Sequence, residues 1–105
     1  MRRDVFQAIA DPNRRAIISL LARQKRLSLH GVAEHFPISR PAISRHIKIL
    51  AECGLVVVHQ QGRERYCEAR LEKLNEVSDW VEHSRKLWEG RLDRLDEFLN
   101  ELQKK

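Results

Sequence analysis

Residues 39–56 read SRPAISRHIKILAECGLV, and this pattern predicts a helix with two contrasting faces. Ile43, Ile47 and Leu50 recur at i, i+4 and i+7, the spacing that places side chains on one face of an α-helix. From Ser39 to Leu50 the sequence has three basic residues, one histidine and no acid. We therefore expect one face to be buried and the other to carry positive and short polar side chains.

Local residues mark both ends of this helix. Ser39 is a preferred N-cap residue, and Pro41 falls in the first turn, where proline is tolerated. At the other end Gly54 can adopt the left-handed C′ conformation, and Leu55 at C″ can pack on Leu50 at C3. The helix is therefore expected to begin after Ser39 and to end before Gly54.

Three shorter helices are predicted before it. Their apolar positions are Val5, Phe6, Ile9 and Ala10; then Ala16, Ile17, Leu20 and Leu21; then Leu29, Val32, Ala33 and Phe36. Asp11 and Pro12 fit the N-cap and first residue of the second helix, which should end near Ala22. Polar residues 23–26 predict a loop. Pro37 ends the third helix, so that only a tight turn separates it from the next.

A β-hairpin and a long helix are predicted after residue 54. Residues 55–58 are apolar and mostly β-branched, Gln61 and Gly62 offer a turn, and residues 65–67 can return as a second strand. From about Leu71 to Leu102 apolar residues recur at steps of three, four or seven without a proline, as in an amphipathic helix. The expected order is α-α-α-α-β-β-α, mainly α with a small β-hairpin.

Two helices joined by a tight turn and followed by a two-stranded ribbon form the winged helix–turn–helix layout. This layout presents one helix to the major groove of DNA and a β-loop beside it. The length of 105 residues predicts a single domain over residues 1–105, with residues 71–104 as its long C-terminal helix.

The acid-free face of the helix after Ser39 is the predicted DNA-binding surface. Its members are short hydroxyl, proline and cationic residues: Ser39, Arg40, Pro41, Ser44, Arg45 and Lys48. Arginine can bind the O6 and N7 atoms of guanine with two hydrogen bonds, and lysine neutralises phosphate charge. An ordinary solvated helix face would mix acids with bases. His46 is open to two interpretations, as a support for the edge of the core or as a phosphate contact.

The charge distribution fits this prediction. The formal net charge is +5, and residues 11–50 hold eight Lys/Arg against two Asp/Glu, so the basic excess is internal. A basic surface suits a polyanion such as DNA, although the same charge can simply aid solubility. With 42% hydrophobic and 33% charged residues the chain is expected to be globular rather than disordered.

The sequence also indicates where the protein acts and what it lacks. It shows no apolar run near the roughly 18 residues of a membrane span and no signal-peptide pattern. Cys53 and Cys67 are too few for a disulfide framework and are interpreted as packing residues, so a cytoplasmic protein is expected. We find no phosphate-binding loop and no nucleophile elbow, and therefore predict that the chain is not an enzyme.

One apolar stripe on the last helix predicts an interface. Its members are Val77, Val81, Trp88, Leu92 and Leu95, and Trp80 flanks it. A terminal helix on a small domain rarely exposes so much apolar surface unless it contacts a partner. The stripe is interpreted as a homodimer interface, and the alternative is that the helix folds back on its own monomer.

Three segments together resemble the ArsR family of bacterial and archaeal repressors. They are residues 39–56, the opening AIADPNRR at residues 8–15, and the turn at residues 61–63. The resemblance implies a homodimer whose first and last helices form the interface, adding Val5, Phe6 and Ile9 to it. It also implies a repressor that binds a palindromic operator. The implied DNA contacts are Ser39, Arg40, Ser44, Arg45 and His46, with Arg63 and Arg65 on the wing.

The chain departs from that family at its metal ligands. Many members use a cysteine pair on the third helix or a carboxylate–histidine set on the last one. Here residues 30–35 contain no cysteine, and no histidine follows two residues after Asp79. The pairs His30–Glu34 and Asp79–His83 are one turn apart but offer too few ligands for a borderline or soft metal. We therefore expect no metal site and no cofactor.

Two further functions remain as alternatives. A repressor of this kind could respond to an unidentified small ligand or metal. A winged helix can also serve as a protein–protein adaptor, since this fold need not bind nucleic acid. An adaptor has no need of the acid-free stretch from Ser39 to Leu50, which favours DNA binding.

Overall fold

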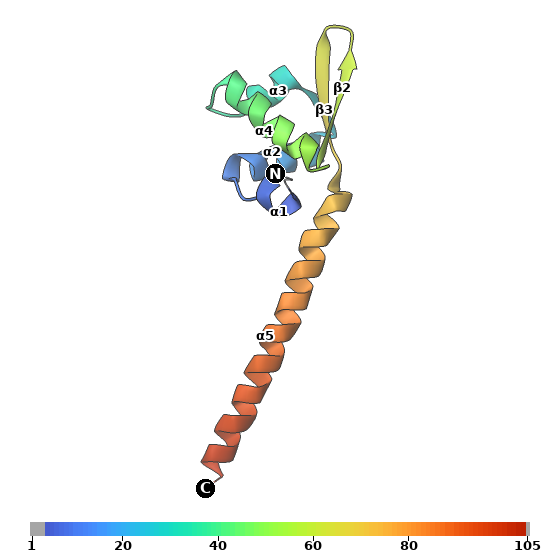
Figure 1. Ribbon diagram of the computed structural model, residues 1–105. Coiled ribbons are helices and arrows are strands. Elements are labelled where there is room, and N and C mark those ends of the chain that lie inside the picture. The colour runs from blue at the N-terminus through green and yellow to red at the C-terminus, as the bar shows by residue number, and fades with distance from the viewer. Residues whose placement is uncertain (1–3, 105) are drawn as a thin grey trace. The chain divides into compact units, whose positions relative to one another are not determined.

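The computed structural model describes residues 4–104 (Figure 1). These residues fall into two compact units, one up to Asn75 and the other from Glu76 onward. The first unit contains four helices and a small sheet, and the second consists of most of the last helix. No helix within residues 4–104 is long and apolar enough to cross a membrane.

Side-chain caps begin the helices of the first unit. These helices are α1 (Val5–Ala8), α2 (Pro12–Gln24), α3 (Leu29–Ala33) and α4 (Arg40–Glu52). The Asp11 carboxylate accepts hydrogen bonds from the Asn13 and Arg14 backbone N–H groups at 2.8 and 3.2 Å, and Pro12 follows as predicted. The Ser39 hydroxyl accepts from the Ala42 N–H at 3.3 Å. Such caps satisfy backbone donors that have no partner inside the helix.

A Schellman motif ends α4, as the sequence predicts. The Leu55 N–H donates to the Leu50 carbonyl at 2.9 Å, and the Gly54 N–H donates to the Ala51 carbonyl at 3.1 Å. Gly54 has a φ of 79°, in the left-handed region that favours glycine. The motif turns the chain directly out of α4 into the following strand.

The sheet has three strands, and its middle strand is the last in sequence. They are β1 (Arg26–Ser28), β2 (Val56–Gln61) and β3 (Glu64–Ala69), in the order β1-β3-β2 with antiparallel pairing throughout. In the hairpin Gln61 pairs with Glu64, so the turn consists of Gly62 and Arg63. Gly62 has a φ of 61°, as expected for the first central residue of a type II′ turn. We call β2, β3 and this turn the wing.

Several sequence-based boundaries need correction. The predicted loop at residues 23–26 is wrong, because α2 continues to Gln24 and residues 26–28 form β1. Lys25 makes the reversal between them with a φ of 66°. The two-stranded hairpin is therefore part of a three-stranded sheet. The first helix ends at Ala8, and the last begins as a 3₁₀ turn (Leu71–Lys73) before α5 (Leu74–Gln103).

The core lies between α2, α3, α4 and the sheet (Figure 1). Ile43, Ile47 and Leu50 are buried, which confirms the predicted inner face of α4. On α2, Ile17, Leu20 and Leu21 are buried as predicted, but Ala16 is exposed and Ile18 is buried instead. Because α2 contacts α4, β1 and β3, its buried face is wider than one stripe.

The helix α5 is amphipathic along its whole length. Apolar side chains at intervals of three, four and seven residues line one side, and none of the described side chains from Leu74 to Gln103 is buried. Trp88 is 61% exposed and Leu92 is 55% exposed. Considered as one unit, this helix therefore carries a broad apolar surface that requires a covering partner in water.

Candidate nucleic-acid interface

The exposed face of α4 carries the predicted DNA-binding residues. Because Ile43, Ile47 and Leu50 face the core, the opposite positions face solvent. These exposed positions are Arg40, Pro41, Ser44, Arg45 and Lys48, with Ser39 exposed at the N-cap. We call this set the α4 face. Residues 39–48 thus present three cations and two hydroxyls without a carboxylate among them.

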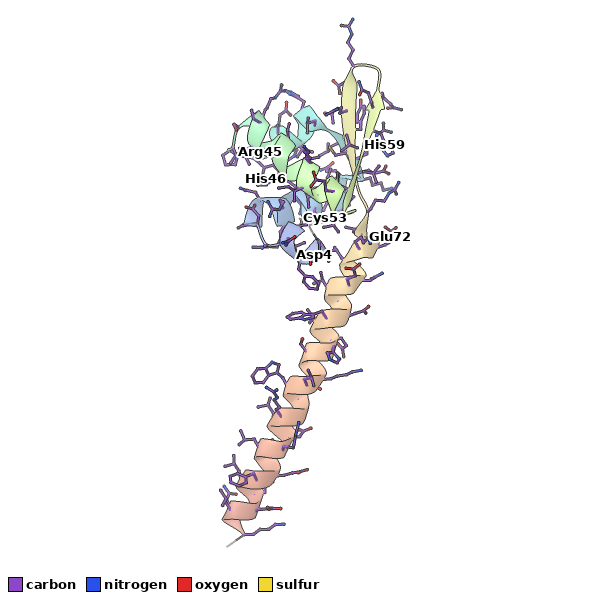
Figure 2. The ribbon with its side chains drawn as sticks, viewed as in Figure 1. Asp4, Arg45, His46, Cys53, His59 and Glu72 are labelled. Atoms are coloured by element: carbon purple, nitrogen blue, oxygen red, sulfur yellow. The ribbon has the colours of Figure 1, made fainter. Side chains whose placement is uncertain are left out.

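His46 differs from the other predicted contacts on α4. Its side chain is half-buried, whereas Arg45 beside it is exposed. Figure 2 labels both residues on α4. The guanidinium of Arg14, at the start of α2, lies 3.4 Å from the Nδ1 atom of the His46 ring. The sequence suggests that His46 either supports the edge of the core or contacts phosphate, and its position is compatible with both. One side of the ring contacts Arg14 of α2, and the other side is partly exposed.

The wing has an inner face directed at α4 and an outer face directed away from it. Side chains alternate along each strand, so the pairs Val58–Cys67 and Gln60–Arg65 share one face. Cys67 is fully buried on that face, and Arg65 is exposed nearer the turn. The inner face of the wing is therefore buried in the core at Cys67 and carries an exposed positive charge, Arg65, nearer the turn.

A groove separates α4 from the inner face of the wing. Its lining includes Ser44, Ile47, Lys48 and Ala51 of α4, Val58, Gln60 and Arg65 of the wing, and Leu29 of α3. The base of the groove is apolar, whereas Lys48 and Arg65 bring positive charge from opposite sides. None of these lining residues is an acid, so a phosphate-bearing strand would meet no repulsive charge there.

The structure distinguishes the two wing arginines. Arg65 lines the groove, whereas Arg63 lies in the turn and is exposed. Both also line a shallow second pocket with Ser28, His30 and Glu64. Sequence reasoning missed Gln60 and Leu29 as groove residues. The alternation of strand residues could have identified Gln60 once the register was known, but nothing local points to Leu29.

Contacts on the outer face link the wing to β1 and also link the two strands of the wing to each other. The Arg26 guanidinium lies 4.3 Å from the centre of the Tyr66 ring and also donates a hydrogen bond to Gln61. His59 Nε2 lies 3.1 Å from the Glu68 carboxylate across β2 and β3. These cross-strand contacts restrict the hairpin from bending relative to the body of the unit.

The described residues offer poor ligands for a metal ion. His30 Nε2 lies 2.8 Å from the Glu34 carboxylate, but residues 4–104 contain no group of three or more His, Cys, Asp or Glu placed to hold an ion. Cys53 and Cys67 are both buried, which confirms them as packing residues. Burial raises the pKa of the Cys67 thiol to about 11, although the Arg65 charge acts in the opposite direction. Burial therefore keeps Cys67 in the thiol form and disfavours the thiolate that soft metals bind.

The residues predicted to form the dimer interface differ in how exposed they are. On α5, Trp80, Val81, Trp88, Leu92 and Leu95 are exposed and Val77 is half-buried, and Leu99 and Leu102 continue the same stripe beyond the predicted set. On α1, Phe6 is 38% exposed and Ile9 is half-buried, but Val5 is only 2% exposed. Val5 is thus already packed inside the single chain.

Comparisons with known proteins agree with this geometry. Residues 11–58 match the model of the family described as bacterial regulatory protein, arsR family. The chain is 36% identical over 78 residues to the transcriptional repressor SdpR of Bacillus subtilis, covering 74% of this chain and 86% of that protein. It is 32% identical over 96 residues to the arsenic resistance transcriptional regulator ArsR1 of Pseudomonas putida, covering 91% of this chain and 70% of that protein.

The fold also matches solved structures. An ArsR-like transcriptional regulator from Rhodococcus sp. RHA1 superposes with a TM-score of 0.79 at 32% sequence identity. The match covers 91% of this chain and 87% of that one. The fold of this chain is therefore shared with a protein described as an ArsR-like transcriptional regulator.

Proposed function

The chain belongs to the arsR family of bacterial regulatory proteins, and is thus a DNA-binding transcriptional regulator and not an enzyme; we propose that it is a homodimeric repressor of a palindromic operator. In this proposal α4 enters the major groove and the wing lies beside it. The observation that carries it is the α4 face, which is exposed, cationic and free of acids, next to a wing that adds Arg65.

The residues of the interface divide between two kinds of contact. Ser44 and Arg45 lie at the middle of the α4 face, where side chains reach base edges, and arginine is suited to guanine. Arg40, Lys48 and Arg65 surround them and are assigned to phosphates, with Arg63 at the wing turn and the Ser39 hydroxyl at the start of the helix. Pro41 has no donor and offers only an apolar contact beside them. Phosphate contacts orient the protein and supply salt-dependent affinity, whereas base contacts supply sequence preference.

The homodimer is supported by the apolar surface of α5. A helix of 30 residues with exposed Trp80, Trp88 and Leu92 needs a partner surface, and a second copy of the same helix provides one. The exposed Phe6 of α1 and the half-buried Ile9 that follows α1 add apolar area to the proposed interface, and Val5 supports them from within. Two copies related by a two-fold axis would bind two half-sites about 34 Å apart, one turn of DNA.

We further propose that repression operates without a metal effector. The buried Cys67 thiol with its raised pKa and the isolated His30–Glu34 pair support this part of the proposal. Adding zinc to the purified protein should then leave its affinity for operator DNA unchanged. A large fall in affinity on adding zinc, reversed by a chelator, would contradict it.

Selection of bound duplexes from a random pool tests DNA binding directly. We expect a two-fold symmetric consensus and an affinity that falls steeply with salt. Lys48→Gln should reduce the salt slope by about one. Lys86→Gln removes a lysine from α5 and serves as the matched control, with no change expected. If the wild-type protein shows no salt-sensitive affinity for any duplex, the DNA-binding proposal fails and the adaptor alternative takes its place.

A further inference from the structure

Arg14 contacts both α1, which is proposed to contribute to the dimer interface, and α4, which is proposed to bind DNA. From the first turn of α2, the Arg14 side chain reaches back to the end of α1 and across to His46 on α4. We propose that Arg14 is a positioning residue for DNA binding, which fixes the His46 ring and anchors α4 to α1. This inference rests on the proposed function, because it concerns how the α4 face is held for DNA.

The first part of the link is at the end of α1. The Arg14 Nε–H donates to the Ala8 carbonyl at 2.7 Å, and its Nη2 donates to the Gln7 carbonyl at 3.0 Å. Carbonyls in the last turn of a helix lack the full set of partners inside it, and a side-chain donor can supply one. The Gln7 carbonyl also accepts from the Ala10 N–H at 3.2 Å. A four-residue helix has few internal hydrogen bonds of its own, and the guanidinium therefore stabilises α1 in its position beside α2.

The second part of the link is the contact with α4. Arg14 Nη1 lies 3.4 Å from His46 Nδ1. Because a guanidinium has donors but no acceptor, Nδ1 must accept the hydrogen bond and cannot carry a proton. The neutral ring then carries its proton on Nε2. Arg14 thereby selects the tautomer in which the other nitrogen of the half-buried ring is a donor, the type of group that binds phosphate or base acceptors.

Asp11 holds Arg14 in place for both contacts. Its carboxylate accepts hydrogen bonds from the backbone N–H groups of Asn13 and Arg14, at 2.8 and 3.2 Å. Desolvation acts to raise the pKa of Asp11, but these two hydrogen bonds and the positive charge of Arg14 lower it overall. The charged carboxylate is therefore favoured beside the guanidinium.

A double-mutant cycle tests the link, with operator affinity as the readout. Arg14→Lys keeps the charge but loses the planar group that bonds three acceptors. We expect it to weaken operator binding about fivefold in the wild-type background and hardly at all when combined with His46→Ala. Equal losses in both backgrounds would overturn the proposal, even if the wild-type protein binds DNA as proposed above.

Arg15→Lys is the matched control. Arg15 also donates to the carbonyl of Ile9, just after α1, at 2.7 Å, and among the described residues it has no hydrogen bond to α4. Its effect on operator affinity should be the same with and without His46→Ala. A coupling to His46 as large as that of Arg14 would mean that stability of α1, and not the link, is measured. Thermal unfolding of each variant checks that the fold is retained.

The tautomer gives a second test on the wild-type protein. Long-range ¹H–¹⁵N spectra of the imidazole rings distinguish a proton on Nε2 from one on Nδ1, and His46→Ala identifies the His46 signals. We expect Nδ1 to be the unprotonated, hydrogen-bonded nitrogen of the neutral ring. A proton on Nδ1 excludes a hydrogen bond from Arg14 and overturns the proposal, whether or not the Arg14 variants fold.

Discussion

Arg45 is the exposed arginine at the middle of the α4 face, where a side chain can reach the edge of a base. Arg45→Ala should cost about 1–3 kcal/mol of operator binding and relax the preference at one base pair, because a bidentate contact with guanine is lost. Repeating the random-pool selection with the variant measures this directly.

Lys48→Ala is the comparison for this prediction. A lysine assigned to phosphate should lose affinity equally on operator and random DNA. If Arg45→Ala also lowers both affinities by the same factor, Arg45 is a phosphate contact and another residue must read the base.

Cys67 predicts a loss of stability at alkaline pH. Burial raises the pKa of its thiol in the folded protein from 9.0 to about 11, so the unfolded chain loses this proton first as the pH rises. The contribution of Cys67 is therefore fully present below pH 9 and is lost as the pH rises toward 11. The free energy of unfolding should fall by about 2–3 kcal/mol across this range.

Urea unfolding between pH 8 and pH 11 measures the effect of this group. Cys67→Ala is less stable at every pH because the site is buried, but it should lack this part of the pH dependence. The other side chains are the same in both proteins, so the difference between the two pH profiles isolates the contribution of Cys67. An identical pH profile in the variant would show that Cys67 does not contribute.

At the scale of the element, Gly54 after α4 and Gly90 within α5 have opposite requirements. Gly54 ends α4 with a φ of 79°, and an added Cβ would lie 3.4 Å from the Lys73 side chain. Gly54→Ala should therefore destabilise the protein by about 1 kcal/mol or more. Gly90 lies inside α5 with open space around its missing Cβ, so Gly90→Ala should stabilise it by about 0.5–1 kcal/mol.

Chemical unfolding of both variants at one protein concentration tests this pair. The same substitution is made in each, so a general effect of adding a methyl group cancels. Destabilisation by Gly90→Ala would mean that the position is covered in the native protein or that α5 is not a continuous helix in solution.

For the whole molecule, the proposed homodimer depends on the apolar side of α5. The helix rises about 45 Å over its length, and the stripe from Val81 to Leu102 faces one direction on it. Trp88→Glu places a carboxylate at the centre of this stripe and should convert the protein to monomers in sedimentation experiments, with weaker binding to the two-fold operator.

Asn100→Glu adds the same charge to α5 about 120° around the helix from Trp88. It should leave the dimer intact. A dimer that survives Trp88→Glu unchanged would place the interface elsewhere and would remove the support that α5 gives to the proposal.

The sequence alone determined those features that depend on residues within about five positions of one another. The N-caps at Asp11 and Ser39 and the Schellman end at Gly54 were predictable because each satisfies backbone groups of its own helix. The buried and exposed faces of α4 follow from its periodicity alone. The exposed α4 face that is proposed to bind DNA could therefore be defined from the sequence alone.

Only the tertiary structure decided the contacts between residues far apart in the chain. Residues 26–28 carry no strand pattern, and they are extended because the edge of β3, about 40 residues later, offers them hydrogen bonds. Ile18 is buried and Ala16 is exposed because of the elements that pack around α2. The contact between Arg14 and His46 joins residues that are 32 positions apart in the chain. A helix cap depends only on interactions between residues close together in the sequence, whereas these contacts form only when separate helices and strands pack against one another.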